Sequence, residues 1–157
     1  LEGYIELKRA MSWTALATGE HHYGRNSFHQ MISARAADIL QPDIEYTGGL
    51  AETLKVYTNA EAAGIETITH MGGNTAWGQH FAMSMPESSL AEWFMHTNIG
   101  QPLGDRLLPG VSTPENGTVT PSDAPGFGLE IPEDWIVPWE HGNQVRVTYL
   151  SPKDSVK

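Results

Sequence analysis

The feature that most constrains this chain is a regular alternation of short apolar runs with stretches of helical spacing. Strand-like runs are expected over Trp13–Thr18, Ala37–Asp43, Ile65–His70 and Ser89–Met95. They are mostly apolar and do not alternate clearly with polar residues, which is typical of strands buried on both faces. Because strands separated by helices form βαβ units, the alternation predicts a parallel sheet in an α/β fold.

The segments between the runs are predicted to be helices. The first is expected to begin at Ser27, which forms a capping-box pattern with Gln30. The second is expected to stop at Gly64 and the third at Pro86, since both residue types commonly follow helix ends. The apolar residues that set these two helical spacings are Leu50, Leu54, Tyr57 and Ala60, and then Trp77, Phe81 and Met85.

A titratable residue accompanies the end of each strand-like run. These residues are Glu20, Asp43, His70 and Glu92, separated by 23, 27 and 22 positions, about one βα unit each. In a (β/α)8 barrel the carboxyl ends of the strands converge on one face, where the active site lies. Packing does not readily explain four such side chains at successive strand ends, so we expect them to face one cavity.

Composition narrows the classes of function. The formal charge of −10 argues against nucleic acid and anionic membrane as partners, because both attract clustered Lys and Arg. No apolar run approaches the ~20 residues of a membrane helix. The absence of cysteine excludes disulfides, thiolate metal sites and cysteine nucleophiles, and it is compatible with the cytoplasmic location that we expect. An anionic substrate would need a local cation such as a metal.

The alternation stops near Gln101. Residues 101–157 begin with a long stretch rich in Pro and Gly without a helical period, so we expect an extended tail that packs across the preceding domain. Within this tail, Asn116, Gly117 and Thr118 fit a glycosylation sequon. Because the chain shows no signal peptide, we expect these three residues to form a turn instead.

Five motifs in the chain together resemble one known family. They occur in order between about Met11 and Trp135: ATGEHHY, ILQPDIEYTGG, TITHMGG, LAEWFM and APGFGLEI. They resemble the mandelate-racemase branch of the enolase superfamily, and within it the L-rhamnonate dehydratases and related sugar-acid dehydratases. The resemblance implies that residues 1–100 are the later βα units of a TIM-type (β/α)8 barrel and that residues 101–157 are a C-terminal segment. It also implies that the capping domain and the early barrel strands lie outside this chain.

The resemblance implies roles for individual residues. Glu20 corresponds to one carboxylate ligand of an essential Mg²⁺, whose other two ligands would lie outside the chain. His70 corresponds to the catalytic base and Asp43 to its partner in a dyad. Glu92 corresponds to the acid that hydrogen-bonds the substrate carboxylate and the enediolate, and His21 is expected to contact the substrate.

The chemistry of these residue types fits such roles. Removing a proton next to a carboxylate creates a dianionic enediolate, which requires a hard cation, a positioned base and a donor to the developing charge. Mg²⁺ prefers oxygen ligands, which suits Glu20, and His70 can take and return a proton near neutrality. The adjacent His21 and His22 raise a zinc alternative, but neighbouring strand residues face opposite ways and could not easily share one ion with Glu20.

The predicted activity is therefore a Mg²⁺-dependent dehydratase acting on a sugar acid such as L-rhamnonate. His70 would remove the C2 proton, and the 3-hydroxyl would leave to give a 2-keto-3-deoxy acid. One alternative is a racemase or epimerase, which needs a second base, usually a Lys on an early strand. Another is a non-catalytic barrel piece that needs a partner segment, because half a barrel has open sheet edges. We expect the full-length protein to form a homo-oligomer.

Overall fold

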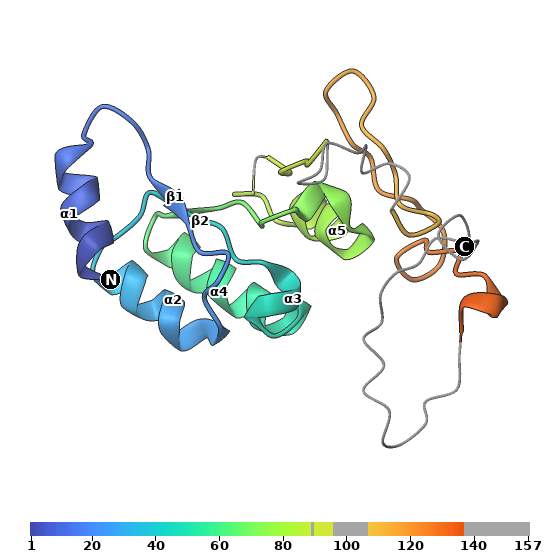
Figure 1. Cartoon of the computed structure of the whole chain (residues 1–157), viewed down its shortest axis with the longest axis horizontal. Helices are drawn as coiled ribbons and strands as arrows, with labels where there is room; N and C mark the ends of the chain where they lie inside the picture. Colours follow the sequence, from blue (N-terminus) through green and yellow to red (C-terminus); the bar gives the residue numbers. More distant parts are fainter. Residues whose placement is uncertain (89, 96–106, 137–157) are drawn as a thin grey trace, which may run out of the picture.

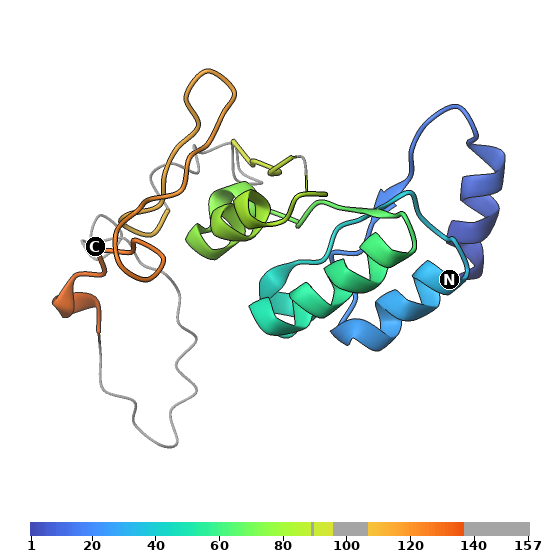
Figure 2. The same cartoon turned by 180° about the vertical axis from the view of Figure 1, so that it is seen from behind.

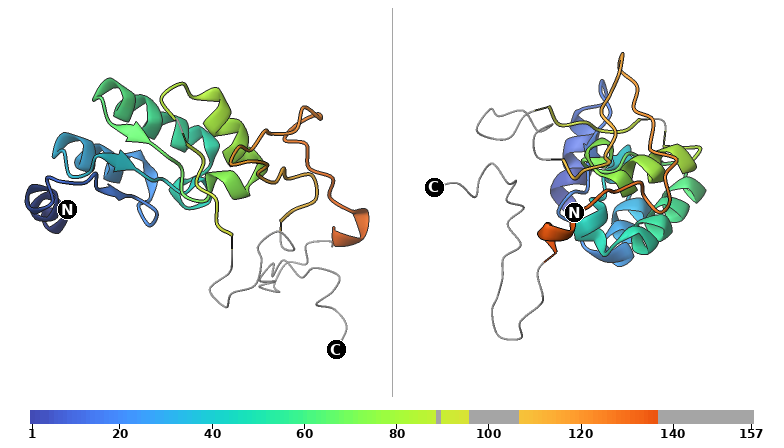
Figure 3. Two further views of the ribbon diagram at one scale, coloured as in Figure 1. Left: turned by 90° about the horizontal axis from the view of Figure 1, so that it is seen from above. Right: turned by 90° about the vertical axis from the view of Figure 1, so that its right-hand side faces the viewer.

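The structure is a computed structural model and describes residues 1–88, 90–95 and 107–136. Figure 1 shows helix α1 at one end of the molecule and segment 107–136 at the other. The view from above in Figure 3 shows the same order along the long axis. The elements are α1 (Glu2–Ala10), β1 (Ala17–Thr18), α2 (Gly24–Ser33), β2 (Ile39–Leu40), α3 (Ile44–Thr47), α4 (Leu50–Ala62), β3 (Glu66–Thr67), η1 (Gly72–Asn74), α5 (Ala76–Ser84) and η3 (Glu133–Trp135).

Three short parallel strands form the sheet, in the order β1-β2-β3. Thr18 pairs with Leu40, and Leu40 pairs with Thr67. Beyond the strands, Asp43 and His70 form one further parallel bridge. The α/β class and the parallel pairing confirm the prediction for the first three runs, although each strand keeps only two residues of its run.

The core lies where α2 and α4 pack side by side against the strands, as Figures 1 and 2 show. The helical spacing in α4 was predicted correctly, but the buried face differs from the one that the leucines indicate. Leu54 is 44% exposed, whereas Thr53 and Val56 are fully buried. The buried core cluster consists of Phe28, Met31, Ile32, Ala36, Ala37, Leu40, Val56, Ala60 and Ile65.

The start of α2 corrects the expected capping box. The helix begins at Gly24, and the Ser27 hydroxyl donates back to the carbonyl oxygens of Tyr23 and Gly24, both at 2.9 Å. The backbone N–H of Arg25 is instead satisfied by the carboxylate of Glu52 on α4, at 2.9 Å. A residue distant in sequence thus caps the start of α2, and Ser27 lies inside the helix instead of at its N-cap.

The ends of α4 and α5 agree with the prediction. Gly64 has a left-handed φ of 67°, and the N–H of Ile65 donates to the carbonyl oxygen of Ala60 at 2.9 Å, which is a Schellman-type end. Helix α5 ends at Ser84, two residues before Pro86.

Helix α1 was not predicted and buries none of its residues. An ion pair joins it to the start of the central strand β2, because Lys8 Nζ lies 2.9 Å from Asp38 Oδ1. The other oxygen of Asp38 accepts from the backbone N–H of Leu16 at 2.9 Å. This N–H and the Lys8 ammonium lower the pKa of the Asp38 carboxyl.

The fourth predicted strand, Ser89–Met95, is wrong for its described part, since residues 90–95 contain no strand. A different set of bonds holds this segment. The Gly73 N–H donates to the Glu92 carbonyl oxygen at 2.8 Å. The side-chain amide of Asn74 exchanges two hydrogen bonds with the backbone of Phe94, at 3.0 and 2.8 Å. The backbone of Glu92 and Phe94 is therefore hydrogen-bonded by helix η1 and the Asn74 amide, and not by a neighbouring strand.

The predicted turn in the tail is confirmed. Asn116 and Gly117 have φ values of 52° and 79°, and Glu115 and Thr118 form an antiparallel bridge around them. Two central residues with positive φ are the mark of a type I′ hairpin turn, for which Asn-Gly is the favoured pair.

Segment 107–136 contacts α5 through Gln79, whose side-chain amide donates to the Ser112 carbonyl oxygen at 2.8 Å. Residues 101–106 and 137–157 of the expected tail lie outside the described residues, so the division at residue 100 stays a prediction. In the described part of the chain, no helix is long and apolar enough to cross a membrane.

Candidate active site

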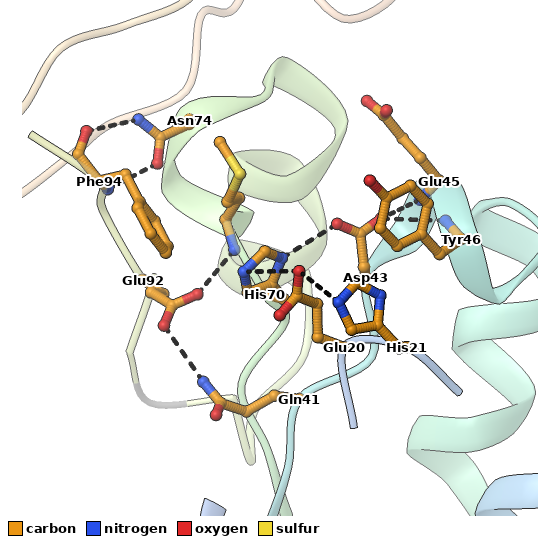
Figure 4. Close-up of polar contacts among 11 residues, drawn as sticks. Glu20, His21, Gln41, Asp43, Glu45, Tyr46, His70, Asn74, Glu92 and Phe94 are labelled. Carbon is orange, nitrogen blue, oxygen red and sulfur yellow. Dashed lines mark hydrogen bonds and ion pairs between the residues drawn. The ribbon is translucent and has the colours of Figure 1, made fainter. Parts of the chain in front are cut away.

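Three of the predicted site residues follow the three strands at the same end of the sheet. Glu20 stands two residues after β1, and Asp43 and His70 each stand three residues after their strands. Because the strands are parallel, these carboxyl ends lie together, and Figure 4 shows the three side chains converging. Glu92 joins them from segment 90–95, which is not a strand in its described part.

A glycine brings Glu20 close to the neighbouring strand. Gly19 has a φ of 143°, and a Cβ at this position would lie 2.9 Å from Phe28 Cε1 and 3.0 Å from the backbone nitrogen of Gln41. Only glycine accepts both this conformation and this approach without strain. The turn after β1 therefore runs directly against the end of β2.

Asp43 and His70 form a hydrogen-bonded pair. Asp43 Oδ2 lies 3.1 Å from His70 Nδ1. Asp43 Oδ1 accepts the N–H groups of Glu45 and Tyr46, at 2.8 and 3.0 Å, and so caps α3. Because an ionised carboxylate only accepts hydrogen bonds, Nδ1 carries the proton and the Nε2 lone pair of His70 is left for the cavity.

The free nitrogen of His70 points toward Glu20. His70 Nε2 lies 3.7 Å from Glu20 Oε1, and His21 Nε2 lies 3.4 Å from the same oxygen. The Phe94 ring packs edge-on against the His70 imidazole with centroids 5.4 Å apart. The His70 side chain is 14% exposed, so it is shielded on most sides but still reaches the cavity.

Glu92 is held by two donors. Its Oε2 accepts the backbone N–H of Met71 at 2.8 Å, and its Oε1 accepts the side-chain amide of Gln41 at 3.3 Å. Met71 has a φ of 51°, an uncommon left-handed value for a residue other than glycine. Strained backbone of this kind tends to occur at functional sites.

Four of the five predicted site residues line one cavity of about 450 Å³, and Asp43 is bonded to one of those four. Sequence reasoning did not single out Gln41, Tyr4 and Phe94, which also line this cavity. Gln41 carried a usable signal, because it stands two residues before Asp43 and so shares its side of an extended chain. The lining residues are Tyr4, Ala17, Thr18, Gly19, Glu20, His21, His22, Gln41, His70, Glu92 and Phe94.

An aromatic group stands beside the cavity. The rings of His21 and Tyr46 stack, with centroids 5.8 Å apart and planes inclined by 18°. Tyr23 packs against Tyr46 at 6.5 Å with an inclination of 37°. Beside them, partial desolvation and the neighbouring Asp43 charge raise the pKa of the Glu45 carboxyl.

His22 is set apart from His21, as the sequence indicated. Its ring packs against Tyr4 and Phe28, with centroids 6.3 and 5.7 Å away. Burial lowers the pKa of His22. Among residues 1–88, 90–95 and 107–136, no group of three or more His, Asp or Glu side chains is arranged to hold a metal.

Among the described residues of the cavity, Glu20 is the candidate to bind a hard cation. The Glu20 side chain is 41% exposed and offers carboxylate oxygens to the cavity, which is the ligand type that Mg²⁺ prefers. Asp43 is hydrogen-bonded to His70. Glu92 accepts hydrogen bonds from Met71 and Gln41. Among the described residues, Glu20 is therefore the candidate ligand for such a cation.

Comparison with known proteins gives several sugar-acid dehydratases among the proteins that the chain is similar to. Over 133 residues the chain is 32% identical to L-rhamnonate dehydratase from Saccharopolyspora erythraea, covering 82% of this chain and 34% of the relative. The structure of L-rhamnonate dehydratase from Gibberella zeae matches with a TM-score of 0.73 and 32% identity, covering 85% of this chain and 35% of that one. L-talarate dehydratase from Polaromonas sp. JS666, complexed with Mg and L-glucarate, matches with a TM-score of 0.65 and 28% identity, covering 85% and 34%.

The chain spans about a third of the length of these relatives. The family described as enolase C-terminal domain-like matches residues 1–135, which is most of the chain. Together with the parallel sheet and the residues at its carboxyl ends, this match identifies the chain as a member of the enolase C-terminal domain-like family.

Proposed function

We propose that the protein containing this chain is a sugar-acid dehydratase. It would eliminate the C2 proton and the 3-hydroxyl of its substrate as water. One observation carries the proposal: the carboxylate-held imidazole of His70 directs its free nitrogen into a cavity that also presents Glu20 and Glu92. The relatives support it, because the similar proteins include L-rhamnonate and L-talarate dehydratases.

The first half of the reaction is a proton transfer to His70. The C2–H bond breaks, the proton goes to Nε2, and the electron pair forms the enediolate of the substrate carboxylate. Asp43 lies 3.1 Å from Nδ1 and favours the imidazolium that forms. Its two bonds from the start of α3 fix the carboxylate and therefore the plane of the imidazole.

The second half is the departure of the 3-hydroxyl. The enediolate electron pair forms the C2=C3 bond, the C3–O bond breaks, and the His70 imidazolium returns its proton to the leaving oxygen as water is formed. The resulting enol becomes a 2-keto-3-deoxy acid. One residue can act as base and then as acid because imidazole exchanges protons near neutrality.

The other residues of the cavity bind the substrate. Glu92, held by Met71 and Gln41, would hydrogen-bond the substrate carboxylate and the enediolate. His21 has a side chain that is 71% exposed and would contact a substrate hydroxyl. Glu20 would be one ligand of Mg²⁺, which when bound polarises the substrate carboxylate and stabilises the enediolate charge.

A racemase or epimerase is the second candidate. Figure 4 shows the Glu20 carboxylate between the imidazoles of His70 and His21, so a second proton-exchanging group stands across that carboxylate from the proposed base. Such a pair would return a proton to C2 instead of expelling the 3-hydroxyl. The chemical outcome at C3 separates the two activities.

The test uses the complete protein with Mg²⁺ and a panel of L-rhamnonate, L-talarate, L-glucarate and galactarate. We expect a 2-keto acid to accumulate from at least one of them, with L-rhamnonate the first candidate. Inversion at C2 without a keto product would establish the epimerase instead. Complete inertness toward sugar acids, with Mg²⁺ shown to bind, would contradict both. The homo-oligomeric state and the cytoplasmic location stay predictions.

A further inference from the structure

The side chains of the site are linked in a closed ring of contacts. Asp43 bonds to His70 at 3.1 Å, His70 lies 3.7 Å from Glu20, and Glu20 lies 3.4 Å from His21. Tyr46 completes the ring, because its aromatic ring stacks on His21 and its backbone N–H donates to Asp43 at 3.0 Å. Figure 4 shows this ring from one side.

We propose that Tyr46 is a positioning residue that holds the His21 imidazole in the orientation needed to contact the substrate. This inference rests on the proposed function, because it assigns His21 to the substrate. Tyr46 lies in the short helix α3, which follows β2, and His21 lies in the turn after β1, so the stack joins two separate segments.

His21 needs such a support. With 71% of its side chain exposed, it has few neighbours among the described residues to restrict rotation about its two side-chain torsions. Its ring contact with Tyr46 is nearly parallel, and this contact fixes the imidazole plane while Nε2 lies 3.4 Å from Glu20 Oε1. Glu20 alone would fix one atom of the imidazole and leave the plane free to turn.

The two contacts of Tyr46 can be separated by mutation. Its bond to Asp43 uses the backbone N–H and survives any substitution except proline. Its contact with His21 uses the aromatic ring alone. Tyr46→Leu therefore removes the stack and keeps the Asp43 cap, whereas Tyr46→Phe keeps both.

The kinetic test uses the complete protein with Mg²⁺ and its sugar acid. Tyr46→Leu should lower kcat/KM about two- to tenfold, the range that loss of one aromatic pair produces, and Tyr46→Phe should restore the parent value. In a His21→Asn background the same Tyr46→Leu change should cost less than about twofold, because coupled residues are not additive. Equal losses in both backgrounds would overturn the proposal.

Tyr23→Leu is the matched control, since it removes an exposed tyrosine of the same aromatic group that stacks less closely than His21 does on Tyr46. We expect less than a twofold change in kcat/KM, and a loss as large as that of Tyr46→Leu would contradict a specific role for Tyr46. The His21 ring protons, followed by NMR in histidine-labelled protein, provide a readout independent of the reaction. Tyr46→Leu should move them downfield by removing the ring-current shielding, and Tyr46→Phe should not.

The two readouts separate the two claims. A protein without dehydratase activity whose His21 signals still respond to Tyr46→Leu would refute the proposed function and leave the positioning geometry intact. An active dehydratase whose His21 signals and kcat/KM ignore Tyr46→Leu would refute the positioning role alone.

Discussion

Asp43 combines two tasks that substitutions can separate. Oδ2 holds His70 Nδ1 at 3.1 Å, whereas Oδ1 caps α3 through the N–H groups of Glu45 and Tyr46. Asn can keep the cap, because Asn and Asp are nearly equal at this helix position. The Asn amide can also present its NH₂ group to His70, and a donor there would favour the tautomer whose proton sits on Nε2.

The structure therefore predicts different effects for three substitutions of Asp43. Asp43→Asn should change the free energy of unfolding by only a few tenths of a kcal/mol, while activity falls about 100-fold because the base carries the wrong tautomer. Asp43→Ala should lose activity to a similar degree and also cost about 1 kcal/mol from the lost cap. Asp43→Ser should restore most of the cap without restoring activity.

The assay pairs kcat on the sugar acid with thermal or urea unfolding of the same preparations of complete protein. A Ser variant as unstable as the Ala variant would show that the Oδ1 bonds do not cap α3. An Asn variant with parent activity would show that His70 does not depend on Asp43 for its tautomer. The proposal that Asp43 and His70 form a catalytic dyad would then be refuted.

Three further predictions follow from other contacts. Gly73→Ala would place a Cβ 2.8 Å from the Glu92 carbonyl oxygen. We therefore expect the free energy of unfolding to fall by about 1–3 kcal/mol and kcat/KM to decrease. Gln41→Leu frees one Glu92 oxygen and should raise KM several-fold with an unchanged melting temperature. The pKa of Asp38 is lowered by the Leu16 N–H, so ionised Asp38 stabilises the folded state above the ordinary Asp pKa. This stabilisation is lost below about pH 4, and Asp38→Asn should therefore weaken the decrease of the unfolding free energy at acid pH.

Much of the fold could be predicted from local pattern. The first three strand-like runs, the stop at Gly64 and the turn at Asn116-Gly117 depend on the backbone preferences of adjacent residues. The proximity of Asp43 and His70 could be anticipated because parallel strands align their carboxyl ends, whereas their pairing as a dyad was implied by the family resemblance.

The remaining features depend on contacts between distant residues. Nothing near Ser27 indicates that Glu52 accepts the N–H at the start of α2. The support of Glu92 by Gln41 and Met71 joins segments far apart in the chain. Periodicity describes a residue's own element, so it cannot identify such partners.

The types of residue in the site could be predicted, but the contacts that hold these residues in place could be predicted less well. Of the four residues expected to face one cavity, Glu20, His70 and Glu92 line it, whereas Asp43 does not and is bonded to His70. Tyr46 was not singled out, because its ring contact with His21 joins α3 to the turn after β1, and local pattern does not indicate such a contact. Their chemical roles stay proposals until they are measured.

The most direct test of the central claim is solvent exchange at C2 in the complete protein carrying His70→Asn. With deuterated water, Mg²⁺ and the sugar acid, we expect C2 exchange and product formation both to fall by about 10⁴-fold, near the upper end for general-base catalysis, while fold and Mg²⁺ affinity are preserved. Loss of product with C2 exchange near the parent rate would show that His70 is not the base. His70 would then be only the acid that protonates the leaving hydroxyl, and the base would lie elsewhere.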